Sequence, residues 1–352
     1  LIFIIVNSKN IIHMLYNLLL SYYYSKHKVL SYQKTLRNRL NLMKKIVLAQ
    51  PRGFCAGVKR AIDIVEKAIE KFGSPVYVRH EIVHNKHVVD RLSKMGAIFV
   101  DEVSQIPKNS HVIFSAHGVS SKVELDAKNR LLSVVDATCP LVKKVHLEAI
   151  KYADDGYKVI LVGHKGHPEV EGTSGRVSQG LIVVETEKQA KNLSLQYASV
   201  KLAYVTQTTL SVDDTKEIIK VLKSRFPNIR GPDTKDICYA TQNRQKAVRK
   251  LAELSDVVLV LGNENSSNSV RLAEISSLMG VPSYRISNVS EVNYDWLKDR
   301  SIIGITAGAS TPEVLVDGLI RDLQSKCGET YIEIMEGDEE KVEFKLPEKV
   351  KI

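Results

Sequence analysis

Short runs of β-branched residues alternate with segments of helical periodicity along most of this chain, and this alternation strongly limits the possible folds. The expected strands cover residues 45–49, 76–80, 97–100, 111–115, 132–136, 158–162, 181–185, 202–206, 257–261, 282–286 and 301–305. Between many of them apolar residues recur at helical spacing, as in residues 57–72, which Gly73 follows as an expected C-cap. Strands separated by helices pair in parallel, so the sequence predicts an α/β protein with mainly parallel sheets.

Three cysteines mark a loose threefold repeat. Cys55, Cys139 and Cys238 are separated by roughly the length of one small α/β unit, and each directly precedes a helical pattern. A thiolate at the start of a helix is stabilised by the helix dipole and by free backbone N–H groups. We therefore expect three α/β domains that bring their cysteines to one centre, residues 44–138, 139–236 and 237–328. A C-terminal tail, residues 329–352, should pack back on the core.

Residues 1–43 differ in composition from the rest of the chain. They carry six of the basic residues behind the net charge of +10 and no acidic residue. One interpretation is a transit or signal segment, and the other, which we favour, is a misplaced translation start ahead of Met43. Their apolar runs are far shorter than the ~18 residues of a membrane span, so no membrane insertion is expected. The remaining basic residues form no cluster with aromatic residues, which argues against nucleic-acid binding.

The number and spacing of the cysteines limit their chemistry. Four cysteines in 352 residues do not form a disulfide scaffold, which indicates a reducing compartment, the cytoplasm or an organelle stroma if residues 1–43 are a transit segment. Zinc sites use paired C-x-x-C spacings, and none occurs. Three thiolates suit one 4Fe–4S cluster with one open iron, although each cysteine alone could be a small buried hydrophobe. Cys327 falls on the last expected helix, residues 312–327, and is interpreted as structural or incidental.

The segment HEIVH, residues 80–84, matches the pattern of zinc proteases, which requires a helix that carries both histidines on one face. Here residues 76–80 are an expected strand, and Asn85 is an expected helix start. The motif should therefore straddle a strand–helix junction, and the protease interpretation is rejected.

Polar loops follow several expected strands. SAHGVSS, GHKGHPEVEGTSG, GNENSSNS and TAGAST are rich in Ser, Thr, Asn and Gly, and TAGAST precedes Pro312 at an expected first helical position. Such residues can be simple helix caps, but together with His84 and His117 they resemble an anion site of N–H, hydroxyl and imidazole donors. His167 and Glu169 in the second loop could form a proton-delivery pair. No common nucleotide-binding motif occurs.

Nine motifs of this chain resemble those of one family, the hydroxymethylbutenyl diphosphate reductases or LytB proteins. The resemblance is continuous from about residue 44 to about residue 345 and is carried by PRGFCAGVKRAI, VRHEIVHNKHVV, FSAHGVS, DATCPLVKKVH, GHKGHPEVEGT, TQTTLSVDDT, DICYATQNRQ, NSSNSVRLAE and TAGASTPEVLV. It implies a trefoil of three small α/β domains around a central cluster. It also implies reductive dehydroxylation of (E)-4-hydroxy-3-methylbut-2-enyl diphosphate to isopentenyl and dimethylallyl diphosphates, the last step of the methylerythritol phosphate route to isoprenoids.

The resemblance also implies a role for each site residue. Three cysteines would hold the cluster, Cys55, Cys139 and Cys238. Glu169 would supply the proton for C–O cleavage, with His167 and Thr208 completing the relay. The diphosphate would be bound by six further residues, His84, His117, Ser266, Ser267, Asn268 and Ser310.

The electrons must come from outside, because no nicotinamide or flavin fold is evident in the sequence. The resemblance implies a ferredoxin or flavodoxin-type donor, and we expect a monomer or a weak dimer. Two other classes stay open at this point. A redox-neutral hydro-lyase could use the open iron as a Lewis acid only, and an iron–sulfur sensor would need no diphosphate pocket.

Overall fold

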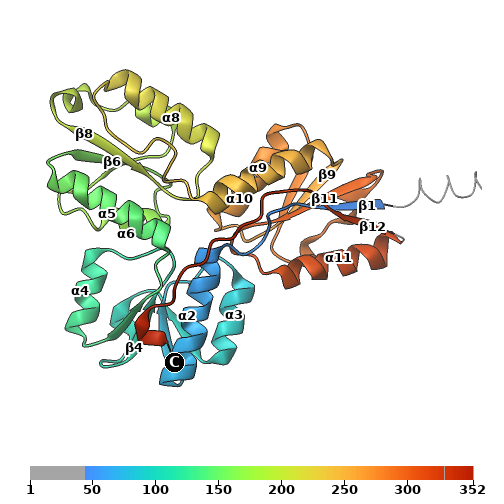
Figure 1. The fold of residues 1–352 in the computed structure, drawn as a ribbon, viewed down its shortest axis with the longest axis horizontal. Helices are drawn as coiled ribbons and strands as arrows, with labels where there is room; N and C mark the ends of the chain where they lie inside the picture. Colours follow the sequence, from blue (N-terminus) through green and yellow to red (C-terminus); the bar gives the residue numbers. More distant parts are fainter. Residues whose placement is uncertain (1–43, 329, 352) are drawn as a thin grey trace, which may run out of the picture.

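The computed structural model describes residues 44–328 and 330–351, which form three lobes around a common centre (Figure 1). Residues 1–43, interpreted above as a leader or a misplaced start, lie outside the described residues. Each lobe holds one sheet, and all nine pairs of neighbouring strands in the described residues are parallel. The predicted α/β class with parallel sheets is confirmed.

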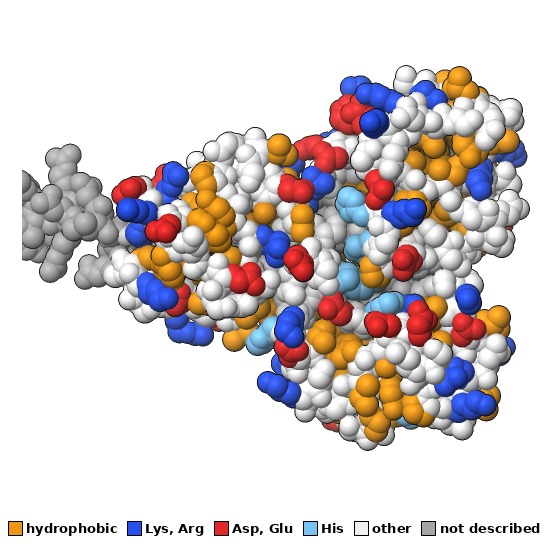
Figure 2. Space-filling view, turned by 180° about the vertical axis from the view of Figure 1, so that it is seen from behind, with side chains coloured by type: hydrophobic (Ala, Val, Ile, Leu, Met, Phe, Trp, Pro, Cys, Tyr) orange, Lys and Arg blue, Asp and Glu red, His pale blue; other side chains and the backbone are white. Residues whose placement is uncertain are grey.

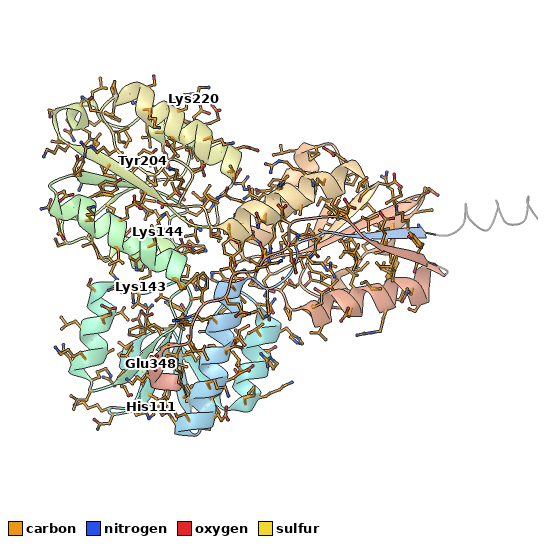
Figure 3. All side chains as sticks on the ribbon, in the orientation of Figure 1. His111, Lys143, Lys144, Tyr204, Lys220 and Glu348 are labelled. Carbon is orange, nitrogen blue, oxygen red and sulfur yellow. The ribbon has the colours of Figure 1, made fainter. Side chains whose placement is uncertain are left out.

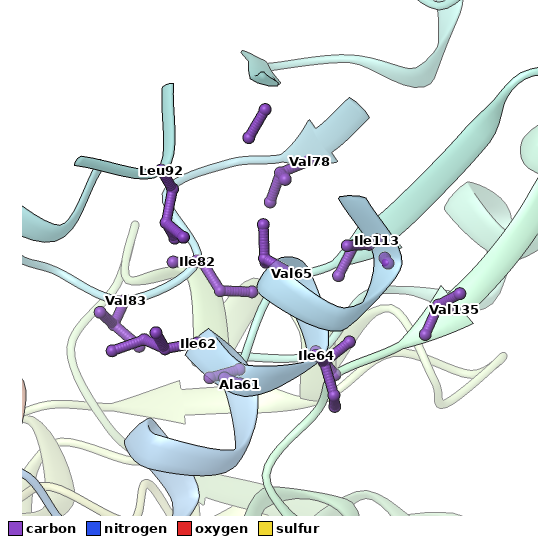
Figure 4. Close-up of a cluster of buried hydrophobic side chains, with 14 of the residues drawn as sticks. Ala61, Ile62, Ile64, Val65, Val78, Ile82, Val83, Leu92, Ile113 and Val135 are labelled. Atoms are coloured by element: carbon purple, nitrogen blue, oxygen red, sulfur yellow. The ribbon is translucent and has the colours of Figure 1, made fainter. Parts of the chain in front are cut away.

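The first lobe is built on a four-stranded sheet in the order β3-β2-β4-β5. Its main elements are α2 (Ala56–Phe72), β2 (Val76–Arg79), α3 (Lys86–Met95), β3 (Ala97–Val100), β4 (His111–Phe114), α4 (Ser121–Asn129) and β5 (Ser133–Asp136). Helix α2 buries one apolar face, including Ile62 and Val65, against Val78 of β2 and Ile113 of β4 (Figure 4). Each such side chain contributes roughly 1.5–3 kcal/mol by leaving water, and together they fix the start of α2 at the centre of the molecule.

The second lobe has three strands in the order β7-β6-β8, and the third has five in the order β10-β9-β11-β1-β12. The second lobe comprises α5 (Pro140–Asp154), β6 (Lys158–Val162), α6 (Pro168–Ser174), β7 (Ile182–Val184), α7 (Glu187–Lys191), β8 (Leu202–Thr206) and α8 (Val212–Arg225). The third comprises β1 (Lys44–Leu48), α9 (Tyr239–Glu253), β9 (Val257–Leu261), α10 (Ser267–Leu278), β10 (Ser283–Ile286), β11 (Ile302–Ala307), α11 (Glu313–Cys327) and β12 (Thr330–Ile334).

Strand β1 does not lie with the residues that follow it in the chain. The expected first domain began at residue 44, yet β1 is inserted between β11 and β12 of the third lobe. Both of its faces are buried there, since Ile46 and Leu48 join one apolar cluster and Val47 and Ala49 another. A strand apolar on both faces needs a neighbour on each side and a covered sheet, which the third lobe provides.

The C-terminal tail connects the third lobe to the first. After β12 the chain crosses the centre of the molecule and ends beside the first lobe (Figure 1). Val350 is fully buried in the apolar core of the first lobe. Midway, both oxygens of Glu340 accept hydrogen bonds from the guanidinium of Arg244 at 3.0–3.2 Å, and Arg244 also donates to the carbonyl of Gly53 at 2.7 Å. The tail is thus held at both ends and at its middle.

We expect Glu340→Ala to lower the free energy of unfolding by about 3 kcal/mol, because it leaves the guanidinium of Arg244 buried without its counter-ion. The side chain of Arg244 is only 1% exposed. Asp338→Ala is the matched control, since Asp338 of the same tail pairs with Lys246 of α9 but both side chains are exposed. It should cost under about 1 kcal/mol in thermal or urea unfolding. Equal losses from both variants would contradict a central role for the buried pair.

Within residues 44–328 and 330–351, no helix combines the length and the apolar character needed to cross a bilayer.

Candidate functional site

One cavity of about 100 Å³ lies where the three lobes meet. Its lining contains all the site residues that the sequence analysis singled out, Cys55, His84, His117, Cys139, His167, Glu169, Thr208, Cys238, Ser266, Ser267, Asn268 and Ser310. Most of them lie in loops or helix starts that follow parallel strands, which is where open α/β sheets commonly bind ligands, whereas Cys238 follows the loop after α8. Figure 2 shows histidine side chains gathered at this junction.

Each of the three cysteines is the N-cap of a helix. Cys55 precedes α2, Cys139 precedes α5 and Cys238 precedes α9, so three helix N-termini point at the cavity. The sulfurs of Cys55 and Cys238 accept backbone N–H groups of the first turn at 3.4 Å. The expectation that each cysteine begins a helix is confirmed. This position favours a negatively charged sulfur, as a metal-bound thiolate is.

The three cysteines are partly buried, and their thiols are close enough to influence one another. Burial, followed by the charge of Cys55, raises the pKa of Cys139 to about 12 and that of Cys238 to about 11. Both groups are therefore protonated at neutral pH and are poor nucleophiles without a metal. Metal binding would replace these protons, which makes the three thiols better suited to holding a metal group than to attacking a substrate.

Gly57 leaves room beside the sulfurs. A Cβ at this position would lie 2.7 Å from the Sγ of Cys139 and 3.8 Å from that of Cys55. Among the described residues no group of three or more His, Cys, Asp and Glu side chains is close enough to hold a single metal ion. A cubane cluster binds each thiolate at a different iron, so its ligands need not meet as those of one ion do. The donor set and the space beside it fit such a cluster.

We expect Gly57→Ala to reduce the iron content of the purified protein by half or more, because the added methyl would force the Cys139 sulfur from its place. Gly318→Ala is the control: it lies in α11, and its nearest contact would be an ordinary 3.8 Å. Removing a helical glycine there should leave iron unchanged and stabilise the protein by roughly 0.5–1 kcal/mol. Iron and sulfide analysis after anaerobic purification measures both effects. Full iron in Gly57→Ala would show that the space is not needed.

Glu169 is a buried carboxyl group whose two oxygens are both held by Thr208. The Thr208 backbone N–H donates to Oε1 at 2.7 Å, and its hydroxyl donates to Oε2 at 3.0 Å. Burial raises the pKa of Glu169 to about 7, although the two hydrogen bonds from Thr208 act in the opposite direction. A carboxyl group with this pKa is a competent proton donor near neutral pH.

His167 caps α6 and orients the segment that carries Glu169. Its Nδ1 accepts the backbone N–H of Glu169 at 3.1 Å. Burial, followed by the nearby His84, lowers the pKa of His167 to about 3, so the ring is neutral at pH 7. A neutral ring that accepts at Nδ1 carries its proton at Nε2, which is then free to donate to a ligand.

Three histidine rings lie together in the cavity. The centroids of His84 and His117 are 4.1 Å apart and those of His84 and His167 are 5.3 Å apart. Burial, followed by the neighbouring histidines, also lowers the pKa of His117 well below its usual value. At neutral pH His117 and His167 can thus serve an anion as neutral hydrogen-bond donors.

The start of α10 supplies further polar groups. Ser266 is its N-cap, yet the Ser266 side chain makes no capping hydrogen bond. Asn268 is buried and neither its Nδ2 nor its Oδ1 has a partner among the described residues, and the same holds for Nε2 of His84. Buried polar atoms without partners are costly, and free N–H groups at a helix start attract anions. These atoms therefore fit an anionic ligand. No Lys or Arg of the described residues lines the cavity.

HEIVH lies between β2 and α3 with Asn85 as the N-cap, as expected, so it cannot act as a helical zinc motif. Pro312 was expected at the first helical position, but it is the N-cap, and α11 begins at Glu313. Cys327 ends α11, far in the sequence from the other three cysteines, and packs partly buried against the core of the third lobe.

Sequence reasoning missed some residues around the cavity. The hydroxyl of Thr241 accepts a hydrogen bond from the Cys238 thiol at 3.1 Å, and the Thr209 carbonyl accepts one from Ser267 at 3.1 Å. Threonine three residues after a helix-capping cysteine was a usable signal, because side chains one turn apart share a face. Gly57 was another, since a glycine in the first turn of a helix is unfavourable unless space is needed.

Comparison with known proteins gives a consistent result. The family described as LytB protein matches residues 46–324. The 4-hydroxy-3-methylbut-2-enyl diphosphate reductase 2 of Bradyrhizobium diazoefficiens is 56% identical over 302 residues, 86% of this chain and 97% of that protein. The 4-hydroxy-3-methylbut-2-enyl diphosphate reductase of Burkholderia pseudomallei is also 56% identical, over 306 residues, 87% of this chain and 97% of that protein.

Two solved structures are similar as well. The E-1-hydroxy-2-methyl-but-2-enyl-4-diphosphate reductase of Plasmodium falciparum aligns with a TM-score of 0.84 at 38% identity, over 88% of this chain and 97% of that one. A second, described as (E)-4-hydroxy-3-methyl-but-2-enyl diphosphate reductase, the terminal enzyme of the non-mevalonate pathway, aligns with a TM-score of 0.59 at 35% identity, over 80% of this chain and all of that one.

Proposed function

The chain belongs to the LytB family, and from this membership we propose how its own residues reduce 4-hydroxy-3-methylbut-2-enyl diphosphate. It is an oxidoreductase of the non-mevalonate route to isoprenoids, and its substrate is a small diphosphate. The products are isopentenyl and dimethylallyl diphosphates. The observation that carries the proposal is one cavity lined by three helix-capping thiols, a buried carboxyl group and an array of hydrogen-bond donors.

Cys55, Cys139 and Cys238 hold one 4Fe–4S cluster with one open iron. When bound, the cluster supplies electrons and a Lewis acid at the hydroxyl end of the substrate. The start of each helix stabilises the thiolate that caps it, and Gly57 keeps the neighbouring space free. Free thiols of this kind need a reducing compartment, for which we propose the cytoplasm.

The diphosphate is bound by the polar residues of the same cavity. Ser266, Ser267 and Asn268 present side chains and backbone N–H groups at the start of α10. Ser310, whose hydroxyl lies 3.5 Å from that of Ser266, extends the same surface. His84 and His117 donate from the first lobe, and the otherwise unpartnered His84 Nε2 gains an acceptor.

Glu169 donates the proton that lets the hydroxyl group leave as water. Thr208 holds both carboxyl oxygens, and His167 orients the Glu169 backbone, so the acid is fixed before the substrate arrives. The overall reaction consumes two electrons and two protons: one C–O bond breaks, one C–H bond forms, and the oxygen leaves as water. The electrons come from an external ferredoxin or flavodoxin-type carrier.

The pH dependence of turnover should follow the protonation state of the Glu169 carboxyl group. Because the acid form is required and the pKa of Glu169 in the free protein is about 7, kcat/KM should be level up to about pH 6 and about half its maximum at pH 7. Above pH 8 it should fall about tenfold per pH unit as the carboxyl group ionises. The pH profile is measured with reduced methyl viologen as donor. The residual rate of Glu169→Gln should not show this fall above pH 8. A wild-type rate that rises between pH 7 and 9 would contradict this role.

The direct test is anaerobic. We would purify the protein, count iron and sulfide, and supply 4-hydroxy-3-methylbut-2-enyl diphosphate with reduced methyl viologen. About four irons and four sulfides per chain, with conversion to the two isoprenoid diphosphates, are expected. An intact cluster without conversion would instead favour a redox-neutral hydro-lyase or a sensor.

A further inference from the structure

A groove of about 670 Å³ lies between α5 and the C-terminal tail, beside the cavity described above but outside it. Its walls come from α5, from the end of β5 and from residues 347–349 of the tail. Figure 3 shows Lys143 and Lys144 on α5 and Glu348 on the tail. Neither the cluster ligands nor the diphosphate-binding residues line this groove.

The groove is positively charged. Four cationic side chains line it, Arg60, Lys143, Lys144 and Lys349, against the two carboxylates Asp136 and Glu348. The ammonium of Lys143 lies 3.2 Å from Asp136, and that of Lys144 lies 3.4 Å from the buried Asp236. Both lysine side chains are still more than half exposed, so their charge remains available to a partner.

The groove also has an apolar part. Leu147 is 60% exposed on α5, although it is a large aliphatic residue. Pro140 and Pro347 lie in the same lining. Apolar residues surrounded by charged ones are typical of protein–protein interfaces, and weak electron-transfer complexes use small interfaces of this kind.

One short segment separates the groove from the cavity. Thr138 and Pro140 line the groove, whereas Cys139 between them lines the cavity. Arg60 reaches across and donates to the carbonyls of Ala137 and Thr138 at 3.3 and 3.1 Å. Lys143 donates its backbone N–H to the Cys139 carbonyl at 2.9 Å. Residues 138–140 thus separate the basic groove from the cavity that the Cys139 sulfur faces.

We propose that this groove docks a small acidic one-electron carrier protein, and that electrons enter through the Cys139 segment. The inference rests on the proposed function, because it assumes that Cys139 binds the cluster. Each turnover oxidises two carriers by one electron each, and these two electrons with two protons reduce the substrate and release water. An acidic carrier is indicated because the cations outnumber the carboxylates and complementary charge speeds the encounter.

The test reverses charge at two exposed positions, Lys143→Glu with Lys349→Glu. Lys144 is left intact because it pairs with Asp236 close to Cys238. The control is Lys216→Glu with Lys220→Glu, two exposed lysines on α8 that give the same charge change in the second lobe. Rates are measured with reduced flavodoxin, an acidic carrier, and with reduced methyl viologen, a small cation that does not need a docking surface.

At low ionic strength the groove variant should lose about tenfold in kcat/KM for flavodoxin, and the loss should shrink at high salt. With methyl viologen its rate should stay within about twofold of wild type. Flavodoxin kinetics within about twofold of wild type, or an equal loss in the α8 control, would overturn the proposal. Failure of the wild-type protein with methyl viologen would instead count against the proposed function.

A second measurement does not depend on variants. Carbodiimide couples carboxylates of bound flavodoxin to nearby lysines of the wild-type protein, and mass spectrometry locates the products. Cross-links at Lys143, Lys144 or Lys349 are expected. Cross-links confined to Lys216, Lys220 or other distant lysines would place the carrier elsewhere and reject the groove.

Discussion

Glu169→Gln should lower kcat at least about 100-fold while the protein keeps its full iron content. General acid catalysis contributes about 10²–10⁴ in rate, and glutamine has nearly the same shape but no proton to give. The glutamine carbonyl can still accept the Thr208 N–H, so the local structure should persist. The measurement is single-turnover conversion of the substrate with reduced methyl viologen, together with iron and sulfide analysis.

The thermal stability of Glu169→Gln is a second readout, and it should rise although the rate falls. In the folded protein the pKa of Glu169 is raised to about 7, above its value in the unfolded chain. Ionisation therefore opposes folding increasingly as the pH rises from about 4.5 to about 7, and the penalty is constant above that pH. Glu169→Gln removes this effect and should raise Tm at pH 8. The control is Glu171→Gln, an exposed residue of the same helix, which should change neither rate nor Tm. Near-normal turnover of Glu169→Gln would reject its role as the proton donor.

Replacing any one cluster cysteine by serine, for example Cys238→Ser, should abolish turnover and remove most of the iron. Three thiolates are the whole protein ligand set of the proposed cluster, and a serine hydroxyl is a far weaker ligand for iron–sulfur clusters. The variants at Cys55 and Cys139 should behave alike, because each cysteine caps its own helix at the same cavity. Visible absorption and iron analysis after anaerobic purification measure the loss.

Cys327→Ser is the internal control for these variants. Cys327 is the last residue of α11 and packs partly buried in the core of the third lobe. We expect it to retain its iron and its activity. Loss of a third or more of the iron in Cys327→Ser would place this residue among the ligands, and full iron in Cys238→Ser would remove Cys238 from them.

Local features of this fold could be predicted from the sequence. The eleven predicted strands correspond to β1–β11, and α2 begins and ends within one residue of the predicted range. Periodicity and capping act over a few residues, so they leave a direct trace in the sequence. Strand β12 was missed because it is an edge strand with mostly exposed or half-exposed side chains, which weakens the buried-strand pattern.

Long-range placement could not be predicted in the same way. Nothing in residues 44–48 indicates that their neighbours are β11 and β12 rather than β2. The raised pKa of Glu169 depends on its burial by the assembled lobes. The hydrogen bonds to its carboxyl group come from Thr208, which follows β8. Both residues stand out in the sequence, but only the fold provides the dry surroundings that make Glu169 an acid near pH 7.

The position of β1 has a consequence for how the protein is made. The first described strand pairs with β11 and β12, so it must wait for partners that are synthesised long after it. The five-stranded sheet of the third lobe cannot close until β12 has left the ribosome. The three thiols can therefore be held together only after residues 330–334 have been made. We expect iron and sulfide to be loaded after that point, and a chain that ends before β11 to lack iron.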